Sequence, residues 1–212
     1  MANYRTRFEQ LILELSSKPE LEITEATIGP ATSPEVLAAA RAVAGAAWPD
    51  GMSELYAELS RVDVEFRSRS GDVPSGGIHI PTVTDVWDHA AHEDELWFDW
   101  LEEDSPLHHI RPIDRFVPEA YAVLYPVPSN SPALVHFHYC GESLVPTGLT
   151  YRAWLEELFK ARGVAYWLDI FTGPRSAYTW VERGHDAMAQ LFPDFDPIGS
   201  APPQPRAEIP ID

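Results

Sequence analysis

Two groups of residues have types and spacings that could do chemistry: an acidic, aromatic run and a set of closely spaced histidines. The run, residues 85–104, reads DVWDHAAHEDELWFDWLEED and holds nine carboxylates and three tryptophans without a Lys or Arg. Carboxylates beside aromatic rings suit a surface that binds a basic protein, by charge complementarity and aromatic anchoring. General acid–base catalysis instead needs two carboxyls in unlike environments, which one solvated helix face does not provide. We therefore interpret this run as protein-binding.

Within the run, residues 93–103 have the period of an amphipathic helix, with leucines and tryptophans on one arc and acids on the other. Trp97 and Trp100 share the apolar arc, so we expect them in the core. The residues that we expect to bind a partner are Asp94, Glu95, Asp99, Glu102 and Glu103, with Trp87 and Phe98 as aromatic anchors.

The most tempting metal motif is the alternation of His136, His138 and Cys140, which a strand would place on one face. Such nitrogen and sulfur ligands could hold zinc. One strand rarely supplies three ligands, however, because its same-face residues are about 6.6 Å apart. We expect no metal and no cofactor, and interpret His136 and His138 as polar residues of a sheet face. A metal-dependent hydrolase using these two histidines is the enzymatic alternative.

No other catalytic set is evident in the sequence. The pairs His89/His92 and His108/His109 lack the His-Glu-x-x-His spacing of zinc proteases, so we interpret them as solvated histidines beside carboxylates. There is no glycine-rich phosphate loop and no Gly-x-Ser-x-Gly elbow. We therefore expect no catalytic residues and a protein that is not an enzyme.

The elements that must position these residues follow from periodicity and from turn and cap residues. Helices are predicted from Tyr4 over about 14 residues, after Ser33-Pro34, from Met52, after Thr150, and over residues 178–191. Strands are predicted over residues 62–66 and 77–81, and residues 120–125 and 133–140 should form a hairpin. Helices, then strands, then helices favour an α+β fold, with a central antiparallel or mixed β-sheet packed by N-terminal and C-terminal helices.

We expect three parts in the chain: an N-terminal helix and linker (residues 1–30), a single α+β domain (31–192) and a proline-rich tail (193–212). The 212 residues are 45% hydrophobic, enough for a sizeable core. A net charge of −18 disfavours nucleic acid and anionic membranes as partners. With one cysteine, no secretory pattern and no apolar run long enough for a membrane span, a cytoplasmic protein is expected.

Several short sequence segments resemble the SUKH superfamily in their order and spacing, over roughly residues 33 to 171. They are WPDGMSELY at residues 48–56, GIHI at 77–80 with DVW at 85–87, IRPIDRF at 110–116, and LTYRAWL at 149–155 followed by Arg162-Gly163 and Trp167. Ser60-Arg61 stands where the family usually has an asparagine-glycine turn.

The resemblance implies a SUKH-like α+β sheet domain flanked by helices, and a role as a bacterial immunity protein. Such a protein binds and neutralises a cognate toxin, while some relatives are regulatory scaffolds, and the family has no agreed catalytic residues. Our leading hypothesis is therefore a non-catalytic immunity protein whose partner is a basic toxin domain. The alternatives are an intracellular regulatory scaffold and the metal-dependent hydrolase, and the sequence leaves the oligomeric state open.

Overall fold

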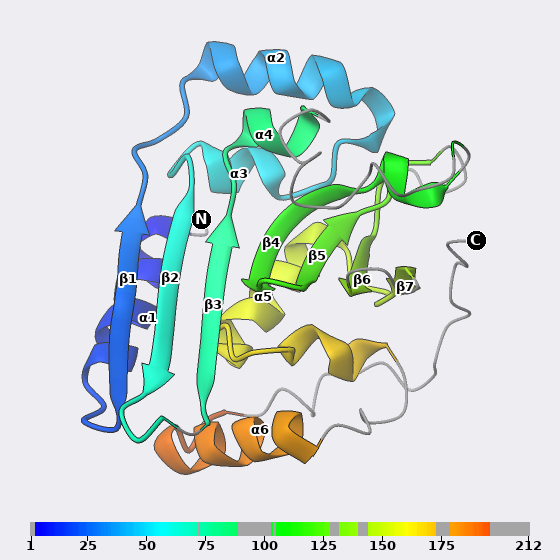
Figure 1. The fold of residues 1–212 in the computed structure, drawn as a ribbon. Helices are drawn as coiled ribbons and strands as arrows, with labels where there is room; N and C mark the ends of the chain where they lie inside the picture. The colour runs from blue at the N-terminus through cyan, green and yellow to red at the C-terminus, as the bar shows by residue number, and fades with distance from the viewer. Residues whose placement is uncertain are drawn as a thin grey trace.

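The protein has an α+β fold with two antiparallel sheets, one of order β1-β2-β3 and one of order β4-β5-β6-β7 (Figure 1). The α+β class predicted from the sequence is thus confirmed. The computed structural model describes residues 3–71, 73–88, 103, 105–127, 132–139, 144–172 and 179–195.

Among the described residues, the first half of the chain contains the three-stranded sheet and four α-helices. Its elements are α1 (Tyr4–Ser16), β1 (Leu21–Ile28), α2 (Pro34–Ala44), the 3-10 helix η1 (Gly45–Ala47), α3 (Met52–Tyr56), β2 (Val62–Ser68), β3 (Ser75–Ile80) and α4 (Val83–Trp87). The described residues of the second half contain the other sheet and two further α-helices. Its elements are η4 (Pro106–His109), β4 (Arg111–Val117), β5 (Ala120–Leu124), β6 (Val135–Tyr139), β7 (Leu144–Pro146), α5 (Tyr151–Ala161), η5 (Trp167–Phe171) and α6 (Thr179–Leu191).

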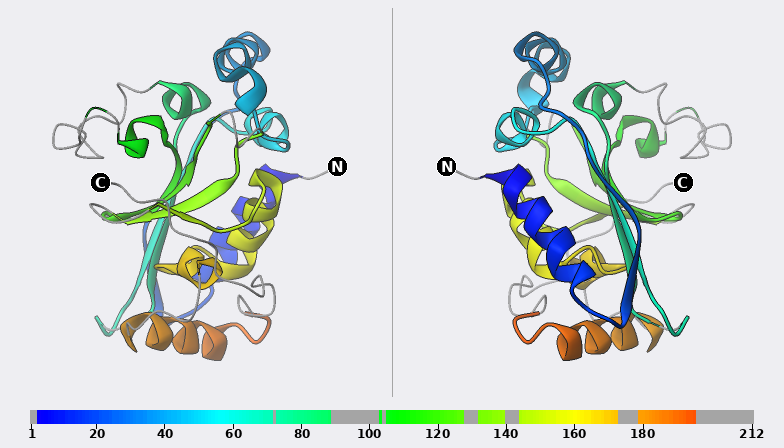
Figure 2. Two further views of the ribbon diagram at one scale, coloured as in Figure 1. Left: turned by 90° about the vertical axis from the view of Figure 1, so that its right-hand side faces the viewer. Right: turned by 90° about the vertical axis from the view of Figure 1, so that its left-hand side faces the viewer.

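The two sheets meet along β3 and β4, which lie side by side (Figures 1 and 2). Helices α1 and α5 pack behind the three-stranded sheet, α6 crosses its lower end, and α2, α3 and α4 gather at its upper end. The opposite face of β1, β2 and β3 is turned toward the viewer in Figure 1, and no helix of the described residues crosses it. One face of this sheet is therefore available for function.

The core lies between the covered face and the α1–α5 helix pair. Helix α1 buries Tyr4, Phe8, Leu11 and Leu15, whose spacing of three and four residues makes one apolar stripe. Phe8 meets Phe159 of α5 with ring centroids 4.6 Å apart. Apolar burial is the main stabilising contribution of such a layer.

The segment expected to be a linker, residues 19–30, contains strand β1. A bulge lies between Ile23 and Glu25, where the pairing with β2 shifts by one residue. The extra residue, Thr24, interrupts the two-residue alternation by which strands are recognised. The apolar residues on either side of the bulge therefore fall out of phase in the sequence, which concealed the strand.

Other local predictions are confirmed where capping or strict alternation is strong. Ser33 and Thr150 open two of the predicted helices, and each accepts a hydrogen bond from a backbone N–H three residues later. Strand β2 alternates buried and more exposed residues along its whole length. Strands β5 and β6 pair antiparallel, as the predicted hairpin requires.

Candidate functional site

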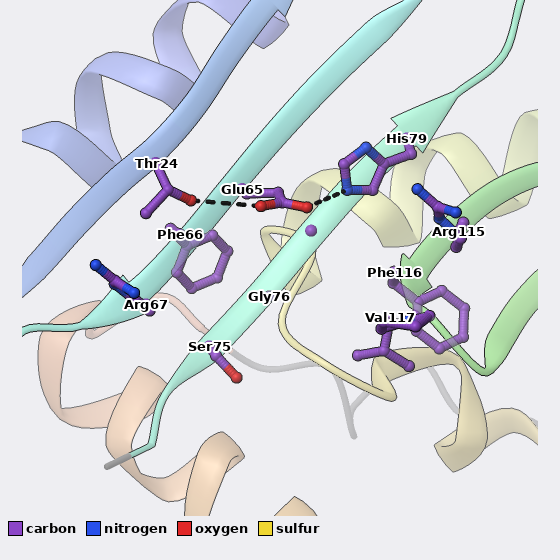
Figure 3. A pocket seen from close by; sticks show the side chains of 12 residues that line it. Thr24, Glu65, Phe66, Arg67, Ser75, Gly76, His79, Arg115, Phe116 and Val117 are labelled. Atoms are coloured by element: carbon purple, nitrogen blue, oxygen red, sulfur yellow. Dashed lines mark hydrogen bonds and ion pairs between the residues drawn. The ribbon is translucent and has the colours of Figure 1, made fainter. Parts of the chain in front are cut away.

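A cleft of about 410 Å³ opens on the uncovered sheet face, where β3 approaches β4 (Figure 3). Its floor is β3 at Gly76 and Gly77, which present no side chains. Glu65 stands on the β2 side and Phe116 on the β4 side, so the cleft combines charged and apolar walls. It follows the strand direction and is open to solvent.

Gly76 and Gly77 are required as glycines for different structural reasons. A Cβ on Gly76 would lie 2.1 Å from the carbonyl oxygen of Gly163, so only glycine lets the chain after α5 approach β3 here. The Gly77 N–H donates to the same oxygen at 3.0 Å. A Cβ on Gly77 would lie 3.0 Å from Nε2 of His79, so glycine makes room for the imidazole on the cleft side.

His79 connects the cleft to two carboxylates of β2. Its Nε2 is 3.3 Å from Oε1 of Glu65 and its Nδ1 is 3.5 Å from Oδ1 of Asp63. The hydroxyl of Thr24 donates to the other oxygen of Glu65 at 3.5 Å, so polar contacts extend across all three strands (Figure 3). The imidazole thus lies between two acidic side chains of β2.

Asp114 of β4 joins the two sheets beneath the cleft. Its side chain is fully buried, and Oδ1 accepts the backbone N–H of His79 at 2.8 Å. The carboxylate thus takes the place of a β4 carbonyl in binding β3. Its Oδ2 has no hydrogen-bond partner among the described residues, although it is buried. A smaller cavity of about 150 Å³ lies beside Asp114 and His79.

Burial raises the pKa of Asp114 to about 7, against an ordinary 3.8. The N–H groups of His79 and Arg115, and the Arg115 charge, oppose this increase but are weaker. The aspartate therefore changes charge near neutral pH at the junction of the sheets.

The side chains that line the cleft are charged, polar and apolar, and Figure 3 shows how they lie relative to one another. Ser75 lines the cleft, but Figure 3 shows its hydroxyl at the far end from His79, so the two do not form a nucleophile–base pair. Glu65, with Arg67 and Arg115 on either side, can bind charged groups of a partner, and the partly buried Val117 can pack against their apolar stems.

Two of the seven predicted partner-binding residues lie among the described residues. Trp87 is half-buried in α4 and stacks on Trp48, with centroids 6.1 Å apart and planes inclined by 22°. Its indole N–H is buried without a hydrogen-bond acceptor among the described residues. Glu103 is exposed in a turn. The other five, Asp94, Glu95, Phe98, Asp99 and Glu102, lie outside the described residues, and their role stays a prediction.

The interpretation of His136 and His138 as part of a polar sheet face is corrected, because both side chains are almost fully buried. A second apolar cluster covers this face of β5 and β6, formed by Leu107, Ile110, Tyr121, Val123 and Leu144. The ring of His138 lies 6.3 Å from that of Tyr121. Burial lowers the pKa of His138 to about 4, so the neutral ring is strongly favoured.

The residues considered as possible metal ligands lie only partly within the described part of the chain. Among the described residues, no group of three or more His, Cys, Asp or Glu side chains could hold a metal ion. Cys140, His89 and His92 lie outside that part of the chain, and His108 and His109 form the end of η4.

Sequence reasoning missed His79 and Asp114 as site residues. One signal was present: consecutive glycines at 76 and 77, where a predicted strand begins, indicate close approach by another group. Asp114 had no comparable signal, because a single acid in an apolar strand resembles any residue on a wet face. Its burial depends on β3 lying against β4, which the local sequence does not determine.

Comparison with protein-family models, with curated proteins and with solved structures finds no match to this chain. The resemblance to the SUKH superfamily therefore stays a prediction. Within the described part of the chain, every helix is too short or too polar to cross a membrane.

Proposed function

We propose that this chain is a non-catalytic binding protein of the immunity type, which neutralises a basic toxin domain in the bacterial cytoplasm. The uncovered face of β1, β2 and β3 would form part of its docking surface. One observation carries this siting: Glu25 of β1 stands directly opposite Glu65 of β2 on that face.

Like charges directly opposite in neighbouring strands destabilise a sheet. At about 5 Å and a dielectric near that of water, the repulsion is about 1 kcal/mol. Two acids of this face contact side chains of the protein itself: Glu22 lies 3.0 Å from Arg67 and Glu65 lies 3.3 Å from His79. A Lys or Arg of a partner placed over Glu25 and Glu65 would convert the repulsion into attraction, which favours a basic partner.

The acidic run lies close to this face in the chain. Helix α4 begins three residues after the last residue of β3, so residues 85–104 start at the end of the strand that forms the cleft floor. Trp87, stacked on Trp48, offers a partly exposed ring there. An acidic face with an aromatic group at its border suits an interface with both steering and anchoring.

The proposal is tested by capture of a partner from the source cells, including their secreted fractions, with identification by mass spectrometry. The tagged full-length protein should retain one basic protein in stoichiometric amount. Glu25→Lys should weaken binding of the purified partner at least tenfold, about 1.4 kcal/mol. Glu9→Lys is the matched control, because it makes the same charge change on α1, behind the sheet.

Each outcome has one meaning. Equal affinity of the wild type and Glu25→Lys would overturn the siting on the sheet face. If Asp99→Lys and Glu102→Lys then weaken binding, the interface lies on the acidic run alone. Absence of a basic partner from all fractions would contradict the immunity function itself.

A further inference from the structure

Helix α2 is almost entirely apolar, yet it is hardly buried. Its sequence, PEVLAAARAVA, has two charged residues, and only Ala40 has a buried side chain. Val36 and Val43 are 43% and 71% exposed, and they are two of the three large hydrophobic residues that are exposed in the described part of the chain. A helix that is apolar on most sides is normally covered on most sides.

The exposed apolar residues form an ordered stripe. Val36, Ala39 and Val43 stand at i, i+3 and i+7, which is the spacing of a helix–helix seam. The inner side of the helix is separate, with Ala40 buried and Leu37 packed on the core. Ala39, between the two valines, is small enough for another helix to approach to about 8–10 Å.

We propose that this stripe pairs with the same stripe of a second copy of the chain, antiparallel about a two-fold axis. The axis would pass near Ala39 and Ala40, the midpoint between Val36 and Val43. Val36 of each copy would then pack on Val43 of the other, as an isologous interface requires. This self-association is independent of the toxin-binding function proposed above.

Charge favours a second copy over a basic partner at this position. Each copy carries −18, so two copies repel unless they meet where charges are few. Residues 36–47 carry a single charge, that of Arg41, so this surface meets that condition. A basic partner would gain little electrostatic attraction here and more on the acidic face.

The size of the stripe sets the strength of the dimer. An 11-residue helix is about 16 Å long, so its face alone buries less than the roughly 800 Å² per partner of a standard interface. We expect a concentration-dependent dimer rather than an obligate one. Because the contact is apolar and the net charges repel, added salt should tighten it, whereas a contact between opposite charges would weaken.

The test is sedimentation equilibrium of the full-length protein from about 1 µM to about 500 µM, in about 0.05 M and about 0.5 M NaCl. The wild type should shift from monomer to dimer, at lower concentration in high salt. Val43→Lys should raise the dissociation constant at least tenfold. Leu13→Lys is the matched control, since Leu13 is 69% exposed and belongs to α1, a helix on another part of the molecule from α2 (Figure 2).

A mixing experiment tests the antiparallel register. Val36→Lys and Val43→Glu should each weaken self-association, but an equimolar mixture should form a heterodimer, because Lys then faces Glu at one contact and Val faces Val at the other. A parallel pair would show no such rescue. A wild type that stays monomeric over the whole range, or a dimer unaffected by Val43→Lys with an unchanged circular dichroism spectrum, would overturn the proposal.

Discussion

Asp114 should make the protein less stable as the pH rises, unlike most acidic groups. Its folded-state pKa is about 7 and its ordinary value 3.8, so between these values the folded protein holds a proton that the unfolded chain releases. The stability contributed by the protonated group is complete below about pH 4 and is lost as the pH rises through 7. A difference of 7 − 3.8, or 3.2 pH units, corresponds to about 4 kcal/mol.

Asp114→Asn isolates this contribution. The amide oxygen can still accept the His79 N–H, while the charge is removed. The amide NH₂ replaces an oxygen that has no hydrogen-bond partner among the described residues, and a buried unpaired NH₂ costs about 1–3 kcal/mol at every pH. We therefore expect the variant to be less stable than the wild type near pH 4 and more stable at pH 8, by about 1–3 kcal/mol in each case.

The measurement is urea unfolding of both proteins at several pH values from about 4 to about 8, with the comparison made between proteins at each pH. His138 titrates in the same interval with the opposite sign, and it cancels in this difference. The reasoning is refuted if the difference in unfolding free energy stays constant across the interval, or if the variant loses relative stability as the pH rises.

Three further perturbations follow from the same contacts. His138→Phe should remove a loss of folding stability in acid. The pKa of His138 is about 4 in the folded state and ordinarily 6.5, so the unfolding free energy of the wild type should fall by up to about 3 kcal/mol relative to this variant as the pH falls through that interval. A difference in unfolding free energy that does not change with pH in urea titrations would contradict this. Glu25→Lys should raise the unfolding free energy by about 0.5–1 kcal/mol, because the new lysine would stand opposite Glu65 and replace a repulsion with an attraction. A lower melting temperature would contradict the assigned register. Arg162→Gln should loosen the end of α6, because the guanidinium donates to both oxygens of Asp194 at 2.9 and 2.8 Å; the exposed carboxylate limits the loss to about 1–2 kcal/mol, and unchanged amide exchange in α6 would argue against this anchor.

The parts of the fold that the sequence predicts are those decided by neighbouring residues. Ser33 and Thr150 mark helix starts because the capping hydroxyl and the N–H that it binds are three residues apart. Strand β1 was missed because its bulge shifts the alternation by one residue, and the compensating pairing with β2 is about forty residues away. Local periodicity carries no information about such a partner.

The candidate site was less predictable than the fold because its main components depend on the contact between two sheets. The acidic run was recognised from composition alone, but Asp63 and Glu65 appear in the sequence only as the wet positions of an alternating strand. Their importance comes from His79, which is two residues beyond Gly77 on the neighbouring strand.

If a basic partner binds over the cleft as proposed, its binding would be linked to protonation of Asp114 at the junction of the two sheets. A cationic group placed over Glu65 would also stabilise the ionised form of Asp114, because the aspartate is bound to the backbone of His79, whose ring contacts Glu65. The pKa of Asp114 should then fall when a basic partner binds, and the complex should release a proton below about pH 7. A buried aspartate that costs the isolated protein stability at neutral pH would in this way favour the bound state. Under the proposed function, protonation of Asp114 would favour the isolated protein and its ionisation the bound state, whereas an asparagine at this position would not respond to the charge of a partner.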